Sequence, residues 1–223
     1  MEDLIRVKEP FRFYTRLHLS ELTGLKAATL NQLLGLIKEV SGSSIYHHTH
    51  RFLEQHQYLS PEPPNDFAYW VSEVLGEDEL GERLASIDTV QYSTIRSLRE
   101  KIAETIEEYL KDNALAKLKF AREGEEFHFV KSVSFILPTN YVVYNLREFT
   151  DTLRKVAIDS LYFHIFEARL RPEKGNNDFS GWIGSSIGDK ELAYEISRLD
   201  PYTYTLEGLR NALINMIENR IAK

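Results

Sequence analysis

The stretch Asn65–Trp70, NDFAYW, recurs 112 residues later as NDFSGW at Asn177–Trp182. The match continues to Asp88 and Asp200, with eight identical residues in 24 aligned positions. Self-similarity at a fixed spacing is the signature of a repeated structural unit, and it governs how every other pattern is interpreted. We therefore predict that the chain contains two copies of one folding unit.

The repeat extends upstream, where a shift of 116 residues aligns Phe11–Leu53 with Phe127–Arg169 without a gap. Identical pairs in this segment include Phe11 with Phe127, Phe13 with Phe129, Ser44 with Ser160, Tyr46 with Tyr162 and His48 with His164. We expect copy one at residues 1–112, a charged linker at 113–126 and copy two at 127–223. Duplicated units commonly bury their apolar faces against each other, so we expect the copies to pack as one unit.

Each copy has the pattern of one strand followed by five helices. Alternating apolar residues in FRFYTRLHL (Phe11–Leu19) and FHFVKSVSF (Phe127–Phe135) predict a half-buried strand or short hairpin. Thr29 with Gln32, and Asn145 with Glu148, have the spacing of a capping box at the first helix. The predicted fold class is mainly α, an α+β fold with a minor sheet, in two tandem pseudo-symmetric copies.

Polar residues mark the starts of the next two helices. Ser43 and Asp159 are aligned candidates to cap the helix that carries the histidines. Asp66 and Asp178 are the candidates to cap the third helix, with Trp70 or Trp182 one turn further on.

Charge and cysteine content narrow the classes of function. The 34 acidic and 27 basic residues give a net charge of −7, and the basic residues are interspersed with acidic ones. This arrangement disfavours nucleic acid and anionic membranes as partners. The chain has no cysteine, no apparent targeting segment and no apolar run close to the ~18 residues of a membrane span, so we expect a cytoplasmic protein.

The stretch YHHTH (Tyr46–His50) raises the question of a metal site. His47, His50 and Glu54 lie at spacings that would place three ligands on one helix face. The aligned residues of copy two are Phe163, Phe166 and Leu170, all apolar, which excludes a metal site shared by the copies. We predict no metal ligands, with a site peculiar to copy one as the alternative, and expect His47 and His50 at a partly buried interface or facing solvent.

His48 differs from its neighbours because it recurs as His164, on a helix face that is otherwise apolar. A buried imidazole needs a hydrogen-bond partner for each ring nitrogen that water does not reach. Two interpretations stay open: a core histidine that ties two helices together, or a pocket histidine held by a carboxylate and able to exchange a proton or bind a ligand.

The Asn-Asp pairs and tryptophans also allow two interpretations. They form either a capped helix start with aromatic anchors, or a site where an amide and a carboxylate bind a polar ligand and tryptophan offers a stacking face, as in sugar sites. The ligand-binding candidates are the recurring residues His48, Asn65, Asp66, Trp70, His164, Asn177, Asp178 and Trp182. GSSIG at Gly184–Gly188 lacks the ending of a phosphate-binding loop and is discounted, and no recognised catalytic motif is present.

The segments SSIYHHTHRFLEQHQYLSPEPPNDFAYWV, LGEDELGERLASID, NDFSGWI and LDPYTYTLEGLR carry a resemblance to a known family. Over nearly its whole length the chain is similar to an uncharacterised bacterial family described only as a domain of unknown function. Members occur alone, or beside or fused to glycosyltransferases and enzymes of alpha-glucan, trehalose or sucrose metabolism. The resemblance implies a carbohydrate setting, but no established activity and no catalytic residues.

From the sequence we expect a non-catalytic cytoplasmic module without a cofactor, which binds a small sugar-type ligand or a partner enzyme. The alternative is a metal-assisted hydrolase or a sugar-modifying enzyme with a site around His48 and Asp66. These alternatives differ in what the two histidines do, which is a question of geometry.

Overall fold

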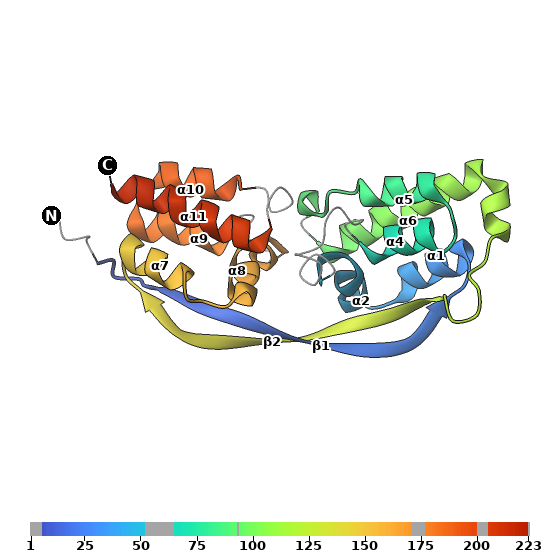
Figure 1. The fold of residues 1–223 in the computed structure, drawn as a ribbon, viewed down its shortest axis with the longest axis horizontal. Helices are drawn as coiled ribbons and strands as arrows, with labels where there is room; N and C mark the ends of the chain where they lie inside the picture. Colours follow the sequence, from blue (N-terminus) through green and yellow to red (C-terminus); the bar gives the residue numbers. More distant parts are fainter. Residues whose placement is uncertain (1–5, 52–64, 93, 171–176, 200–204, 223) are drawn as a thin grey trace. The chain divides into compact units, whose positions relative to one another are not determined.

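The computed structural model describes residues 6–51, 65–92, 94–170, 177–199 and 205–222, and its regular structure is mainly helical (Figure 1). In these ranges the β component is one sheet of two antiparallel strands, β1 (Phe11–Ala27) and β2 (Phe127–Val143). The expected fold class, mainly α with a minor sheet, is therefore confirmed. Within the described ranges, no helix has both the length and the apolar character needed to cross a membrane.

The chain forms two compact units: unit 1 is Met1–Leu17 with Ser134–Lys223, and unit 2 is His18–Val133. The helices of unit 2 are α1 (Leu30–Glu39), α2 (Gly42–Tyr46), the π-helix η1 (His47–Arg51), α4 (Asp66–Glu73), α5 (Asp78–Ala85), η2 (Thr89–Gln91), α6 (Ile95–Asp112) and η3 (Ala114–Leu118). Those of unit 1 are α7 (Leu146–Leu153), α8 (Ile158–Ile165), η4 (Glu167–Leu170), α9 (Asp178–Trp182), the π-helix η5 (Ile183–Ile187), α10 (Lys190–Ser197) and α11 (Leu206–Ile221).

The boundaries between the units lie inside the two strands. Residues 11–17 of β1 belong to the same unit as helices α7 to α11, which lie more than a hundred residues later in the chain. Residues 127–133 of β2 belong to the unit that contains α1 to α6. The boundaries at 112 and 127 are those of the sequence repeat. The boundaries of the compact units lie instead within β1, after Leu17, and within β2, after Val133.

The beginning of each strand contributes a pair of phenylalanines to a hydrophobic core. Phe127 and Phe129 are buried in the core of unit 2, among residues of α1, α4, α5 and α6. Phe11 and Phe13 are buried in the core of unit 1, among residues of α7 to α11. The alternation predicted for these four residues is confirmed.

Further along β1 the predicted burial fails. Leu17 and Leu19, which the alternation placed on the buried face, are 49% and 51% exposed. The physical reason is that the two cores include β1 only near its ends, at Phe11, Phe13 and Ala27.

The first helix of each unit begins as predicted. Thr29 Oγ1 accepts from the backbone N–H of Gln32 at 3.3 Å, and Asn145 Oδ1 accepts from that of Glu148 at 2.8 Å. The side chains of Gln32 and Glu148 reach back to the N–H groups of Ala28 and Tyr144, each at 2.8 Å. These bonds satisfy amides that a helix start leaves unpaired.

The caps predicted for the next helices are wrong. α2 and α8 follow Ser41 and Ala157, which make no side-chain capping bond. Ser43 and Asp159 lie within the first turn, because each helix begins earlier than the cap positions assigned to it.

The burial of the phenylalanine pairs leads to a stability prediction. Phe13 is 1% exposed and Phe120 is 73% exposed. Truncating a fully buried phenylalanine to alanine costs about 3–5 kcal/mol, through lost apolar burial and the cavity left behind. Phe13→Ala should lower the free energy of unfolding of unit 1 by this amount, as measured by urea denaturation, while Phe120→Ala should change it by less than about 0.5 kcal/mol. Equal effects of the two substitutions would contradict the assignment of Phe13 to this core.

Candidate functional site

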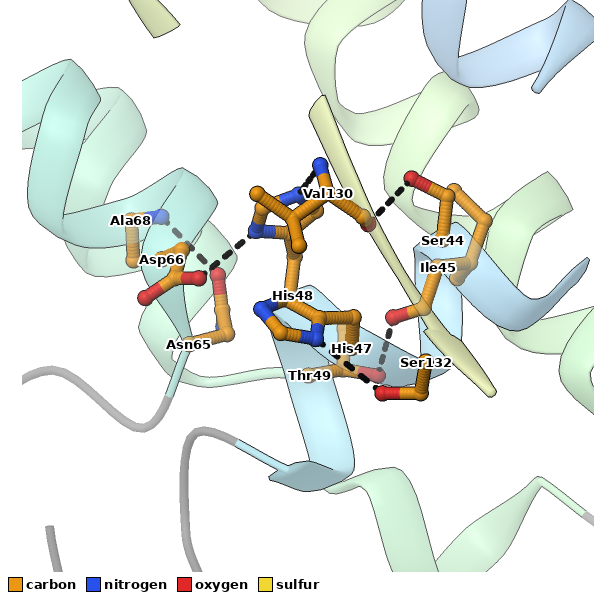
Figure 2. A network of polar contacts seen from close by, with 10 residues as sticks. All are labelled: Ser44, Ile45, His47, His48, Thr49, Asn65, Asp66, Ala68, Val130 and Ser132. Atoms are coloured by element: carbon orange, nitrogen blue, oxygen red, sulfur yellow. Dashed lines mark hydrogen bonds and ion pairs between the residues drawn. The ribbon is translucent and has the colours of Figure 1, made fainter. Parts of the chain in front are cut away.

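His48, on η1, is held through both ring nitrogens (Figure 2). Its Nε2 accepts a hydrogen bond from the backbone N–H of Val130 at 2.9 Å, and its Nδ1 lies 2.6 Å from Oδ2 of Asp66. A backbone N–H donates only to an unprotonated ring nitrogen, so the ring proton lies on Nδ1 and is donated to Asp66. The imidazole is therefore a fixed connection between β2 and α4.

Two further side chains of unit 2 bind the backbone of the same strand or of the segment that leads into it. The hydroxyl of Ser44 donates to the carbonyl oxygen of Val130 at 2.8 Å, so both peptide groups of Val130 face side chains of the α2–η1 segment (Figure 2). The indole N–H of Trp70 donates to the carbonyl oxygen of Glu125 at 2.8 Å. We call Ser44, His48 and Trp70 the strand clamp of unit 2.

Unit 1 has a strand clamp of the same chemistry, formed by Ser160, His164 and Trp182. His164 Nε2 accepts from the N–H of Tyr14 at 2.8 Å, and Ser160 donates to the carbonyl of Tyr14 at 2.6 Å. Trp182 Nε1 donates to the carbonyl of Glu9 at 2.9 Å. In both units all three bonds are made to backbone atoms, so they fix the position of the strand segment without depending on its side chains.

The carboxylate partner of each histidine stands at the start of a helix. Asp66 and Asp178 were expected as the N-caps of α4 and α9, but the N-caps are Asn65 and Asn177. Each aspartate is the first helical residue, where the helix dipole favours a negative charge. Its carboxylate is therefore available to the histidine, at 2.6 Å for Asp66 and 2.9 Å for Asp178.

The side-chain amides of the two asparagines form hydrogen bonds within the protein through both their oxygen and their nitrogen atoms. Asn65 accepts from the N–H of Ala68 at 2.8 Å and donates to the carbonyl of Leu84 at 3.1 Å. Asn177 accepts from the N–H of Ser180 at 2.8 Å and donates to the carbonyl of Ile196 at 3.3 Å. Each amide therefore caps one helix and ties it to the end of the next one.

The predicted site residues of unit 1 also line an open pocket of about 830 Å³. His164, Asn177, Asp178 and Trp182 all contribute to its wall. Unit 1 therefore has features of both interpretations of the recurring histidine. His164 is hydrogen-bonded through both ring nitrogens, as a core histidine would be, and the residues around it line a cavity.

The pocket has further lining residues that the sequence did not single out. They are Arg12, Tyr14, Phe163, Gly181, Ser185 and Ser186, together with Glu9, Pro10 and Phe11 and with Ile136 of β2. Arg12 and Tyr14 were missed because the sequence repeat does not show that the first strand packs on the helices of the second copy. The two serines belong to the GSSIG segment, whose small side chains leave room for the pocket instead of forming a phosphate-binding loop.

Small residues open the pocket of unit 1. Gly181 is the fourth residue of α9, and a Cβ atom built on it would meet nothing within 4 Å. The fourth residue of α4 in unit 2 is Tyr69, and the eighth is Glu73 where the other unit has Ser185. The two units therefore share a clamp and differ in the bulk of the side chains beside it.

His47 and His50 make protein contacts of their own. His47 Nδ1 lies 3.0 Å from Oγ of Ser132, and His50 Nδ1 lies 3.0 Å from Oγ1 of Thr49, with its ring stacked on Tyr46 at 5.5 Å. Both histidines are buried, so the expectation that they face solvent or a partly buried interface is wrong.

No group of three metal-ligating side chains occurs among the described residues. Glu54, the third member of the metal hypothesis, lies outside the described ranges.

Burial lowers the pKa of His47 to about 4, and the neighbouring His48 adds to this effect. Since the pKa in the folded state lies below the unfolded value of 6.5, protonation favours unfolding. The stability that depends on neutral His47 is complete above pH ~6.5 and is lost as the pH falls toward ~4, by up to about 3 kcal/mol.

Replacing His47 should therefore flatten the pH dependence of stability. His47→Phe places at this position the residue found at Phe163 of unit 1, and removes the titrating group. The loss of unfolding free energy between pH 6.5 and pH 4 should become smaller in urea titrations, although Ser132 loses a partner at a cost of about 1 kcal/mol. His128→Gln, at an exposed position, is the matched control and should leave the slope unchanged. An unchanged slope in His47→Phe would contradict the assigned pKa.

Removing a clamp histidine should destabilise its unit. His164→Ala leaves the N–H of Tyr14 and the carboxylate of Asp178 without this partner, and His48→Ala does the same to Val130 and Asp66. Each substitution should cost on the order of 3 kcal/mol, because buried polar groups are left unsatisfied. Amide hydrogen exchange at Tyr14 or Val130 should become faster in the affected unit only. A loss in both units alike would contradict separate clamps.

Comparison with known proteins gives the context of this arrangement. No curated protein matches the chain. Among solved structures, OrfY from Thermoproteus tenax is similar over 99% of this chain and 100% of that chain, with 29% sequence identity and a TM-score of 0.81. A family model described as "Family of unknown function (DUF5752)" matches residues 8–218, a range that includes both strand clamps and the pocket. The chain therefore belongs to this family of unknown function.

Proposed function

We propose that the protein is a non-catalytic binding module whose unit 1 pocket takes a small sugar-type ligand. The observation that carries the proposal is the pocket wall, where an aromatic surface meets a few polar groups. Binding pockets for small molecules typically combine apolar and aromatic walls with a small number of placed polar groups.

The polar groups of the wall suit a ligand with several hydroxyls. Asp178 is a carboxylate acceptor, Arg12 offers guanidinium donors, and the hydroxyls of Ser185 and Ser186 both donate and accept. Tyr14 and Phe163 add aromatic rings against which the C–H face of a sugar packs. This composition supports the carbohydrate setting that the family resemblance implies, and an enzyme of carbohydrate metabolism is the partner class that fits it.

The state of the histidines supports binding rather than catalysis. A general acid or base needs a ring nitrogen that reaches the substrate. In both units Nε2 accepts from a backbone N–H and Nδ1 faces an aspartate, so both positions of the ring are engaged. Proton transfer through either ring would first require the strand or the aspartate to leave.

An enzyme built on His48 and Asp66 is the second candidate, either a metal-assisted hydrolase or a sugar-modifying enzyme. One observation favours it: the Asp66 side chain is 31% exposed although it is bonded to a buried histidine, whereas that of Asp178 is 7% exposed. A carboxylate that faces both solvent and a histidine is a reasonable acid or base. Time-resolved NMR of sugars with the protein distinguishes the candidates, because binding shifts signals without forming product.

The binding proposal is tested by blocking the pocket. A thermal-shift screen should cover neutral sugars, sugar phosphates and nucleotide sugars, since a ligand at 100 times its Kd stabilises the folded state by about 2.7 kcal/mol. Gly181→Tyr should abolish the shift, because the new side chain starts in open space at the pocket wall.

Tyr69→Gly makes the reverse change at the corresponding position of α4 and is the matched control. It should keep the ligand-induced shift. A shift that survives Gly181→Tyr would place the ligand elsewhere, and no shift with any member of the three sugar classes would count against a sugar-type ligand.

A further inference from the structure

The bonds of the two strand clamps join distant parts of the chain. In unit 1 the partners in the three clamp bonds are separated by 146, 150 and 173 residues. In unit 2 the separations are 86, 82 and 55 residues. Unit 1 is thus completed by a strand that precedes unit 2 in the chain, whereas its clamp residues all follow unit 2.

Recognition at each clamp has an apolar part besides the backbone bonds. Phe127 stacks on Phe67 with ring centres 5.1 Å apart, and it meets Trp70 edge-on at 5.8 Å. In unit 1 Phe11 packs against Phe179 at 5.4 Å and Trp182 at 5.7 Å. Without the strand, the aromatic surfaces of the helices in each unit would be exposed to water. Burial of this apolar area therefore favours binding of the strand.

The two clamps hold the same backbone pattern with different side chains. The strand residue held by histidine and serine is Val130 in unit 2 and Tyr14 in unit 1, and the residue between the phenylalanines is His128 or Arg12. The clamp therefore requires the Phe-x-Phe pair and a free backbone edge, and it tolerates changes at the other positions. Docking of a strand by its backbone edge is a known mode of peptide recognition.

We propose that each clamp is a docking site for a strand in its own right, which also accepts residues 9–14 or 125–130 from a second copy of this chain. The covalent connection then serves to raise the local concentration of the strand, and it is not part of the recognition. The partner is a second copy, because its strands carry the phenylalanine pair that fits the aromatic surfaces of both units.

Cutting the folded full-length chain tests the proposal. The segment 122–124 is exposed and contains Gly124 with φ of +89°, so a site for a specific protease fits between Glu123 and Gly124. Cleavage gives one piece with β1 and the helices of unit 2, and another with β2 and the helices of unit 1. Each piece then holds the strand of the other, so both should elute together in size-exclusion chromatography with the mass of the uncut chain, 25.9 kDa plus the inserted site.

Exchange between copies is the second part of the experiment. Cleaved protein in isotope-labelled and unlabelled forms is unfolded together, refolded and examined by native mass spectrometry. Complexes that combine a labelled piece with an unlabelled one are expected. Separation of the two pieces after cleavage, or refolded complexes without mixing, would overturn the proposal.

Clamp variants show whether the clamps, rather than strand pairing alone, hold the pieces together. Ser44→Ala with Ser160→Ala removes one backbone bond per unit and should raise the Kd of the cleaved complex on the order of tenfold. Ser43→Ala is the matched control, because its hydroxyl contacts only Ser41 among the described bonds, and it should leave the Kd unchanged. An equal Kd for the clamp variant and the control would assign the association to the sheet and refute a clamp-based docking site.

Discussion

A backbone N–H donated to an imidazole nitrogen is the interaction on which each unit depends. A two-stranded sheet leaves one edge of each strand without a partner, and buried peptide groups must be paired. At Tyr14 and Val130 the pairing is supplied by a histidine and a serine rather than by a third strand. The same imidazole donates a hydrogen bond from its Nδ1–H to the aspartate at the start of α9 or α4, so one ring connects its own helix to the strand and to the start of another helix.

This connection explains why the recurring polar residues lie where they do. The asparagine caps the helix whose first residue is the aspartate, and the tryptophan one turn later fixes the residue that leads into the strand. Each side chain is buried or half-buried because its polar atoms are already paired inside the unit. The ligand-binding chemistry proposed for unit 1 therefore rests on residues around the clamp, such as Arg12 and Ser185, more than on the clamp itself.

Much of this could be predicted from the sequence. Recurrence separated His48 from His47 and His50, and it gave a short set of candidate partners, Asn65, Asp66 and Asp88, of which Asp66 is the partner in the structure. The capping residues Thr29 and Asn145 were also correct, since a short polar side chain three residues before Gln or Glu has few other uses. These predictions depend on local spacing, which the sequence displays directly.

The predictions that failed depend on which distant segments meet. Alternation shows that Phe11 is buried, but it does not say that the helices covering it begin at Leu146. Without that knowledge neither the half-exposed Leu17 nor the contribution of Arg12 and Tyr14 to the pocket follows. His47 looked replaceable because Phe163 stands at its position in the other copy, yet it is buried against Ser132, a partner from β2.

Because the boundaries between the units lie within the strands, the two units differ in when they can fold during synthesis on the ribosome. Unit 2 is one continuous stretch, His18–Val133, and all of its parts have been made once its last strand has emerged. Unit 1 combines residues made before unit 2 with helices made after it, so the apolar rings of Phe11 and Phe13 stay uncovered until α7 to α11 have also been made. The order of translation thus makes unit 2 the first to fold and the N-terminal strand the segment most in need of protection.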